Sequence, residues 1–215
     1  KTMQPNANGV HEPEAAGAFA WVLYHAWKET GNPEYLKGAE WSMEFLNNWT
    51  SNPSYELQLP YGTYTAGKMN AELGTNYNVQ KMLNWSFDRG PLRGWGTIVG
   101  SWGGYDVSGL VGEANDADND YAFQLNGVQQ AAALVPMVRY DKRFARAIGK
   151  WMLNLSNATR LFFPGFFSRW LATRPFARST KICRHTLRAM RYRAAGRLPI
   201  WHYTEPGPLA TSVPW

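Results

Sequence analysis

Two kinds of helix alternate along the first part of the chain. From Ala15 to Trp27 there is no Asp, Glu, Lys or Arg, and a helix that is apolar nearly all round is typical of a buried position. The following segment, from about Glu34 to Asn47, is amphipathic. Its apolar stripe comprises Tyr35, Leu36, Ala39, Met43 and Leu46, opposite Lys37, Glu40 and Glu44. The pattern predicts a hairpin with a buried inner helix and an outer helix that faces water.

Between these two helices stand residues suited to ending one and starting the next. Gly31 is expected to cap the C-terminus of the first helix and Asn32 the N-terminus of the second. Pro33 suits the first helical position, where its missing N–H costs nothing.

The same order recurs later in the chain. The segment from Tyr121 to Val138 is uncharged, with Pro136 expected to kink or end the helix, and Arg143 to Leu155 is its charged amphipathic partner. The turns at Asn32 and Asp141 share a local pattern at an offset of 109 residues. Inner helices shielded on all sides and outer helices facing water are what a ring of α-hairpins requires, so the predicted fold class is all-α.

The stretch between the two hairpins, Leu59 to Gly112, has a different composition. From Pro60 to Gly112 it holds 11 of the 20 glycines, eight aromatic residues and only seven charged residues. Glycine at this density predicts repeated turns and close backbone approaches rather than long regular elements. Among these loops we expect a helix from about Asn78 to Phe87, capped by Asn76. Loops rich in Trp and Tyr predict the functional surface, although an irregular connection that only packs is the alternative.

Charge divides the chain into two parts. The net charge is +6, but residues 165–215 carry nine basic residues against Glu205 alone, which leaves residues 1–164 at −2. We therefore expect a hairpin domain over 1–164 and a basic, poorly patterned segment over 165–215, and no nucleic-acid partner. The second part is either an arm for an acidic partner or, as we favour, not the natural continuation of the first. We expect nearly all of the core within residues 14–157.

Few features bear on the location of the protein. A single cysteine, Cys183, excludes an internal disulfide framework. No uncharged run is both long and apolar enough to span a bilayer. Because the chain opens at Lys1 without an initiator methionine, it is expected to be a processed product or a fragment, and secretion or a periplasmic location is favoured.

Three segments carry a resemblance to a known superfamily: Gly17 to Leu46, Asn70 to Tyr77, and Trp102 to Leu110. With these segments the chain resembles the six-hairpin (α/α)-toroid superfamily of carbohydrate-active enzymes, in a bacterial polysaccharide-processing branch. The resemblance implies a cleft at one end of the ring, walled by loops that present aromatic platforms and carboxylates. It also implies that the chain is an incomplete toroid, and that its partner is a poly- or oligosaccharide.

Glycoside hydrolysis needs two carboxylates, one protonated acid and one base or nucleophile. Asp106 follows Trp102 and Tyr105, and a partly dry setting beside aromatic faces is expected to raise its pKa toward acid work. Glu72 lies near several asparagines, whose amides could keep it ionised or orient sugar hydroxyls. Asp106 and Glu72 are therefore the predicted catalytic pair, with a structural role for each as the alternative. The predicted sugar-binding residues are Tyr61, Asn70, Asn76, Tyr77, Trp95, Trp102 and Tyr105.

An acidic run offers a possible metal site. Asp116, Asp118 and Asp120 alternate as in the opening of a calcium loop, but Tyr121 and Gly127 stand where an EF-hand requires Gly and Glu. A solvated acidic turn is favoured over a calcium site, and no other cofactor is expected. His25, on the uncharged helix, is interpreted as a hydrogen-bonded core residue.

Three functions remain open from the sequence. The leading hypothesis is a glycoside hydrolase. A polysaccharide lyase of the same fold would use Tyr77 or Tyr105 as base beside Asn76, with Arg93 or Lys68 holding a uronate. The third is a non-catalytic carbohydrate-binding or scaffold module. The sequence leaves the sugar, its linkage and the oligomeric state undetermined.

Overall fold

The fold is mostly helical, with a small antiparallel sheet. The structure is a computed structural model that describes residues 13–91, 94–102, 105–113 and 121–162. The helices in these ranges are α1 (Ala15–Thr30), α2 (Pro33–Asn48), α3 (Gln58–Leu73), α4 (Val79–Phe87), α5 (Gln124–Met137) and α6 (Ala145–Thr159). Short 3₁₀ turns at Lys142–Phe144 and Arg160–Phe162 flank α6. Within the described ranges no helix combines the length and apolar character needed to cross a bilayer.

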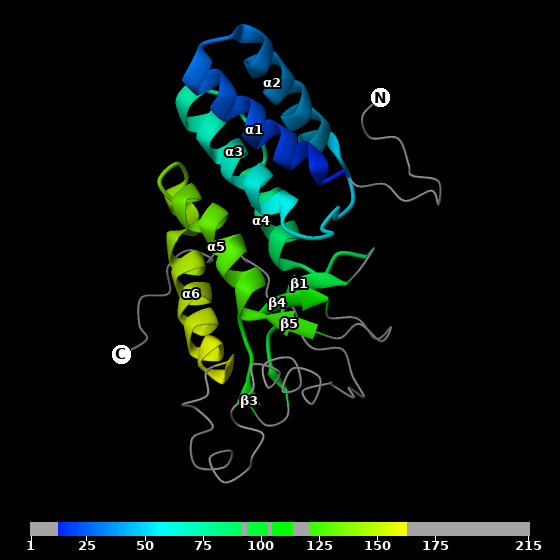
Figure 1. Cartoon of the computed structure of the whole chain (residues 1–215), viewed down its shortest axis with the longest axis vertical. Coiled ribbons are helices and arrows are strands. Elements are labelled where there is room, and N and C mark those ends of the chain that lie inside the picture. The colour runs from blue at the N-terminus through cyan, green and yellow to red at the C-terminus, as the bar shows by residue number, and fades with distance from the viewer. Residues whose placement is uncertain (1–12, 92–93, 103–104, 114–120, 163–215) are drawn as a thin grey trace, which may run out of the picture.

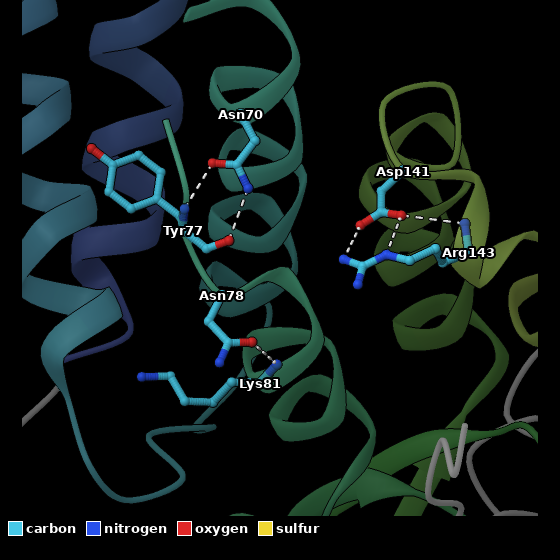
Figure 2. A network of polar contacts seen from close by, with 6 residues as sticks. All are labelled: Asn70, Tyr77, Asn78, Lys81, Asp141 and Arg143. Atoms are coloured by element: carbon cyan, nitrogen blue, oxygen red, sulfur yellow. Dashed lines mark hydrogen bonds and ion pairs between the residues drawn. The ribbon is translucent and has the colours of Figure 1, made fainter. Parts of the chain in front are cut away.

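The turn between α1 and α2 forms as the sequence predicts. Gly31 takes the left-handed conformation, with φ of 69°, and its N–H donates to Trp27 O. The Asn32 side chain accepts from the N–H of Glu34, and Pro33 is the first residue of α2. The predicted cap of α4 was wrong, because Asn78 rather than Asn76 accepts from the N–H of Lys81, at 2.9 Å (Figure 2).

Helix α3 stands where loops were predicted. Its glycines serve close helix packing instead of turns. A Cβ at Gly62 would lie 2.7 Å from the Cα of Gly17 on α1, so the two backbones touch directly. Pro60 lies in the first turn of the helix, where a missing N–H breaks no helical hydrogen bond. Glycine density therefore marked a close approach correctly but gave the wrong secondary structure.

The helices form three consecutive pairs (Figure 1). Helices α1, α3 and α5 lie side by side in a row, with α3 in the middle, and each is followed by a helix that packs back against it. Gly17 meets Gly62 near the start of α1 and α3, and Lys28 meets Glu72 near their ends, so these two helices are parallel. Gly67 of α3 contacts Met137 at the end of α5, which runs in the same direction.

The uncharged helix α1 is buried on one side only, which corrects the prediction that it is shielded all round. Ala16, Ala20 and Tyr24 are fully buried, whereas Phe19 and Val22 are 50% and 53% exposed. In the described part of the chain, α2 and α3 are the helices that pack against α1. Its remaining side faces away from them.

Short strands in the central stretch and just after it correct the all-α prediction. Strands β1 (Trp95–Thr97), β4 (Val111–Glu113) and β5 (Tyr121–Phe123) form an antiparallel sheet in the order β1-β4-β5. Strands β2 (Ser101–Trp102) and β3 (Tyr105–Asp106) form a separate hairpin. Strands of two or three residues are too short to show the alternation that identifies a strand in sequence. The indole N–H of Trp151 on α6 donates to Gly109 O at 3.0 Å and so connects the strand region to the α5–α6 pair.

The Gly17–Gly62 contact predicts a large loss of stability on adding one methyl group. Gly62→Ala should lower the free energy of unfolding by ~1–3 kcal/mol, because the new Cβ meets backbone that cannot rotate away. Gly149→Ala is the matched control: it lies inside α6 with no atom within 4 Å of the added Cβ, and it should stabilise by ~0.5–1 kcal/mol. Urea unfolding followed by circular dichroism measures both. Equal effects at the two positions would contradict the close approach.

Candidate functional site

Half-buried aromatic rings from α1 and α3 form a continuous row. Trp21 meets Tyr61 edge-on, with ring centroids 5.0 Å apart. His25 stacks on Tyr64, with centroids at 6.0 Å and planes inclined by 14°. Tyr64 in turn meets Tyr140, just beyond α5, at 5.8 Å. These rings lie on the side of α3 opposite α4, since α4 contacts α3 through the buried Thr63–Ser86 pair.

A charged cluster lies at the end of this row. Lys68 Nζ is 2.5 Å from Glu72 Oε1, and it also donates to the Tyr140 hydroxyl oxygen at 3.0 Å. Glu72 Oε2 accepts from the Tyr24 hydroxyl at 2.9 Å and lies 3.3 Å from Lys28 Nζ. We call this cluster and the aromatic row together the α3 face. It comprises Trp21, Tyr24, His25, Lys28, Tyr61, Tyr64, Lys68, Glu72 and Tyr140.

Glu72 is held as a carboxylate. Burial raises the pKa of Glu72, but hydrogen bonds from Lys68, Tyr24 and Lys28 lower it by more. The pKa therefore lies below its ordinary value. The sequence predicted that the asparagines near Glu72 could keep it ionised. The ionised form is supported, but the groups that hold it are two lysines and a tyrosine. An ionised Glu72 suits a base or nucleophile and not a general acid.

Tyr140 is a tyrosine of this face whose pKa is lowered. The hydrogen bond from Lys68 lowers its pKa, burial opposes this, and the hydrogen bond with Tyr64 adds to the lowering. Burial raises the pKa of Tyr24 and of Tyr64. The hydrogen bond of Tyr24 to Glu72, and that of Tyr64 to Tyr140, raises each pKa further. Tyr140 can therefore act as a proton acceptor more readily than its neighbours.

Asn70 and Tyr77 hold the turn between α3 and α4. Asn70 Oδ1 accepts from the Tyr77 N–H at 2.8 Å, and its amide donates to the Tyr77 carbonyl at 2.8 Å (Figure 2). Burial, with Glu44 and Glu40 nearby, raises the pKa of Tyr77 to about 12. This pKa does not favour Tyr77 as a base. Asn76, in the same turn, is exposed.

Asp106 occupies an exposed position on β3 and caps a turn. Its Oδ1 accepts from the N–H of Ser108 at 2.9 Å. Hydrogen bonds from the side chain and the backbone of Ser108 lower its pKa against a small opposing effect of burial. The expected rise of this pKa was therefore wrong, because the carboxylate faces water and donors instead of a dry aromatic pocket.

The other predicted sugar-binding aromatic residues of the central stretch differ in how far they are buried. Trp95 is 4% exposed and belongs to the core, which does not suit a stacking platform. Tyr105 is exposed on β3, opposite Trp102 in the hairpin, and the Trp102 side chain lies outside the described part. Tyr61 is half-buried in the α3 face.

The structure does not bring Asp106 and Glu72 together. Glu72 pairs with Lys68, which contacts Tyr140 beyond the C-terminal end of α5. The hairpin of Asp106 belongs to the strand region that leads into the N-terminal end of α5 (Figure 1). A helix of this length spans about 20 Å, so the two carboxylates lie at opposite ends of it.

The predicted calcium loop is not described. Asp116, Asp118 and Asp120 lie in 114–120, outside the described residues. Across the described ranges, no group of three or more His, Cys, Asp or Glu side chains could hold a metal ion.

Most of the α3 face could not be predicted from the sequence. His25 was predicted to be a hydrogen-bonded core residue, and its Nδ1 does lie 2.8 Å from Trp21 O, but its ring is only half-buried. A usable signal was present: Tyr61, Tyr64, Lys68 and Glu72 are spaced i, i+3, i+7, i+11, which places them on one side of a helix. That spacing has meaning only once this glycine-rich segment is recognised as helical.

Because comparisons with known proteins found no match, any functional inference rests on the α3 face. No protein-family model, no curated protein and no solved structure matches this chain.

The paired carboxylate predicts a pH-dependent contribution to stability. Because the pKa of folded Glu72 lies below its ordinary value near 4.5, its stabilising contacts are fully present above that pH and are lost as the pH falls. Glu72→Gln should therefore unfold more easily than the wild type at pH 7, and the difference should shrink below pH 4.5. Thermal melts at pH 7 and pH 3 measure this. Glu29→Gln, exposed at the same end of α1, should have little effect at either pH.

Proposed function

We propose that this chain is a carbohydrate-active protein whose α3 face binds a poly- or oligosaccharide. The observation that carries the proposal is the row of half-buried rings next to two lysines and a carboxylate. Aromatic faces pack against the apolar faces of sugar rings, and a few placed polar groups orient the hydroxyls. Rings and polar groups in one row match both requirements.

The arrangement of the helices supports an incomplete (α/α) toroid as the finer fold. Three parallel helices, each backed by a returning helix, correspond to three consecutive hairpins of a six-hairpin ring. In such a ring the side of α3 opposite α4 looks inward. The α3 face would then line the interior, where the resemblance to toroid enzymes implies the substrate lies.

Binding is better supported than hydrolysis. A glycosidase needs a second carboxylate about 5–10 Å from the first, to act as acid, and Asp106 does not join Glu72. The Asp141 carboxylate, next to Tyr140, is already engaged by Arg143 at 2.7 Å (Figure 2). Hydrolysis at the α3 face thus depends on an acid other than the predicted one.

Removal of one ring should weaken binding measurably. Tyr64→Ala and Trp21→Ala should each cost ~1 kcal/mol or more, about fivefold in Kd, from a lost aromatic contact and its buried area. Trp41→Ala is the matched control, since Trp41 is 62% exposed on the outer helix α2. An oligosaccharide array identifies the ligand, and titration calorimetry measures the three variants. Equal losses in Trp41→Ala, or no ligand on the array, would contradict the proposal.

A lyase reaction is the second candidate, favoured by the environment of Tyr140. Its oxygen accepts from Lys68, and its pKa is lowered. As base, it would take the C5 proton of a uronate while the C4–O bond breaks. The leaving oxygen takes a proton back from Tyr140 or from water, which gives an unsaturated sugar and a free hydroxyl end. Lys28 or Lys68 would hold the uronate carboxylate.

The lyase candidate makes a separate prediction. The wild type should generate ultraviolet absorbance from the unsaturated product, and Tyr140→Phe should abolish it while leaving saccharide binding intact. Tyr77→Phe should keep the activity, because the turn places that hydroxyl among Glu40 and Glu44 and away from Lys68. If no uronate polymer gives a change in absorbance, the lyase candidate is contradicted and saccharide binding remains the proposed function.

A further inference from the structure

The two ends of the helix row present uncharged, apolar sides that point away from α3. On α1, Gly17 packs against α3. At about 100° per residue, Phe19 and Val22 lie nearly opposite Gly17. Both are about half exposed, at 50% and 53%. No charged residue occurs on α1 before Lys28.

Helix α5 presents the equivalent side at the other end of the row. Met137 packs on Gly67 of α3, and Val128 and Val135 lie nearly opposite Met137 on the helix. They are 53% and 44% exposed, and Leu125 beside them is 61% exposed. There is no charged residue anywhere on α5.

The two sides also match in height. Gly17 lies against Gly62, and Gly67 lies against Met137. Gly67 follows Gly62 by five positions, and Val22 follows Gly17 by the same number. Because α1, α3 and α5 run parallel, Val22 on α1 and Met137 on α5 lie at the same height along the helix axes. Val135, two residues before Met137, lies close to that height.

We propose that a second copy of this chain covers both sides, with α5 of each copy against α1 of the other. A two-fold axis parallel to the helices, through the centre of the ring, makes the two seams identical. Each seam continues the row α1–α3–α5 with another parallel helix pair of the kind already present within the chain. Two sets of three hairpins then close a ring of six, with both α3 faces turned inward.

Contrast with the outer helices supports this assignment. Helices α2 and α6 also expose large hydrophobic residues, but these do not form a contiguous patch. They are Tyr35 and Trp41 on α2 and Leu153 on α6, and they stand among charged positions such as Lys37 and Lys150. Single exposed hydrophobic residues are normal, whereas contiguous uncharged patches mark interaction sites. The inference rests on packing alone and holds whether or not the α3 face binds a sugar.

The test is the oligomeric state of the full chain and of charge variants. Light scattering after size exclusion should give a dimer for the wild type. Val22→Lys or Val135→Glu alone should weaken the dimer at least tenfold, because each buries an unpaired charge. The double variant should restore it, since the introduced ammonium group of one copy then faces the introduced carboxylate of the other. Leu153→Lys on α6, at a residue 74% exposed, is the matched control and should remain dimeric.

The other possible results each contradict the dimer or its closure into a ring. A wild type that stays monomeric up to tens of micromolar overturns the proposal, and so does dissociation of Leu153→Lys equal to that of Val22→Lys. A series of masses above the dimer overturns the closed two-copy ring. Circular dichroism of every variant excludes loss of folding as the cause.

Discussion

The direct contact between the backbones of Gly17 and Gly62 is the constraint on which the site depends. With no side chain between them, α1 and α3 lie close enough for their longer residues to meet across the seam. Above this contact, Trp21 reaches Tyr61, His25 reaches Tyr64, and Lys28 reaches Glu72. Larger residues at either glycine would separate the helices and draw each of these pairs apart. Packing thus sets the geometry of the polar cluster.

Lys68 extends the same arrangement to the third helix of the row. Its ammonium group contacts Glu72 on its own helix and Tyr140 beyond α5, and it lies over the Tyr140 ring at 4.9 Å. Because the Lys68 side chain is mostly buried, these contacts are less screened than a surface ion pair. Lys68 on α3 therefore links α1, through Glu72 and Tyr24, to the residues that follow α5.

The sequence predicted the outer parts of the fold better than its centre. Gly31, Asn32 and Pro33 act through local backbone chemistry, which a sequence displays directly, and these predictions were confirmed. Helix α3 was missed because its glycines are explained only by a partner 45 positions away, which no local pattern reveals. For the same reason the α3 face was not predicted, since it combines residues from α1, α3 and the end of α5. For Asp106 the local sequence was misleading. Its aromatic neighbours in the sequence predicted a dry site, but the short β2–β3 hairpin exposes it to water.

The charge balance of the α3 face distinguishes between the two proposed functions. Parallel helices place their negative dipole ends together, and Lys28, in the last turn of α1, offsets part of that charge, with Lys68 one turn before the end of α3. Glu72 neutralises one of these two cations, and an ionised Tyr140 would neutralise the other. A uronate held for elimination while Tyr140 is a phenolate would bring a third negative charge against two lysines, next to the helix ends. A neutral saccharide adds no charge and can use the same lysines as hydrogen-bond donors. The electrostatics of the site thus favour binding of a neutral sugar over elimination from an acidic one.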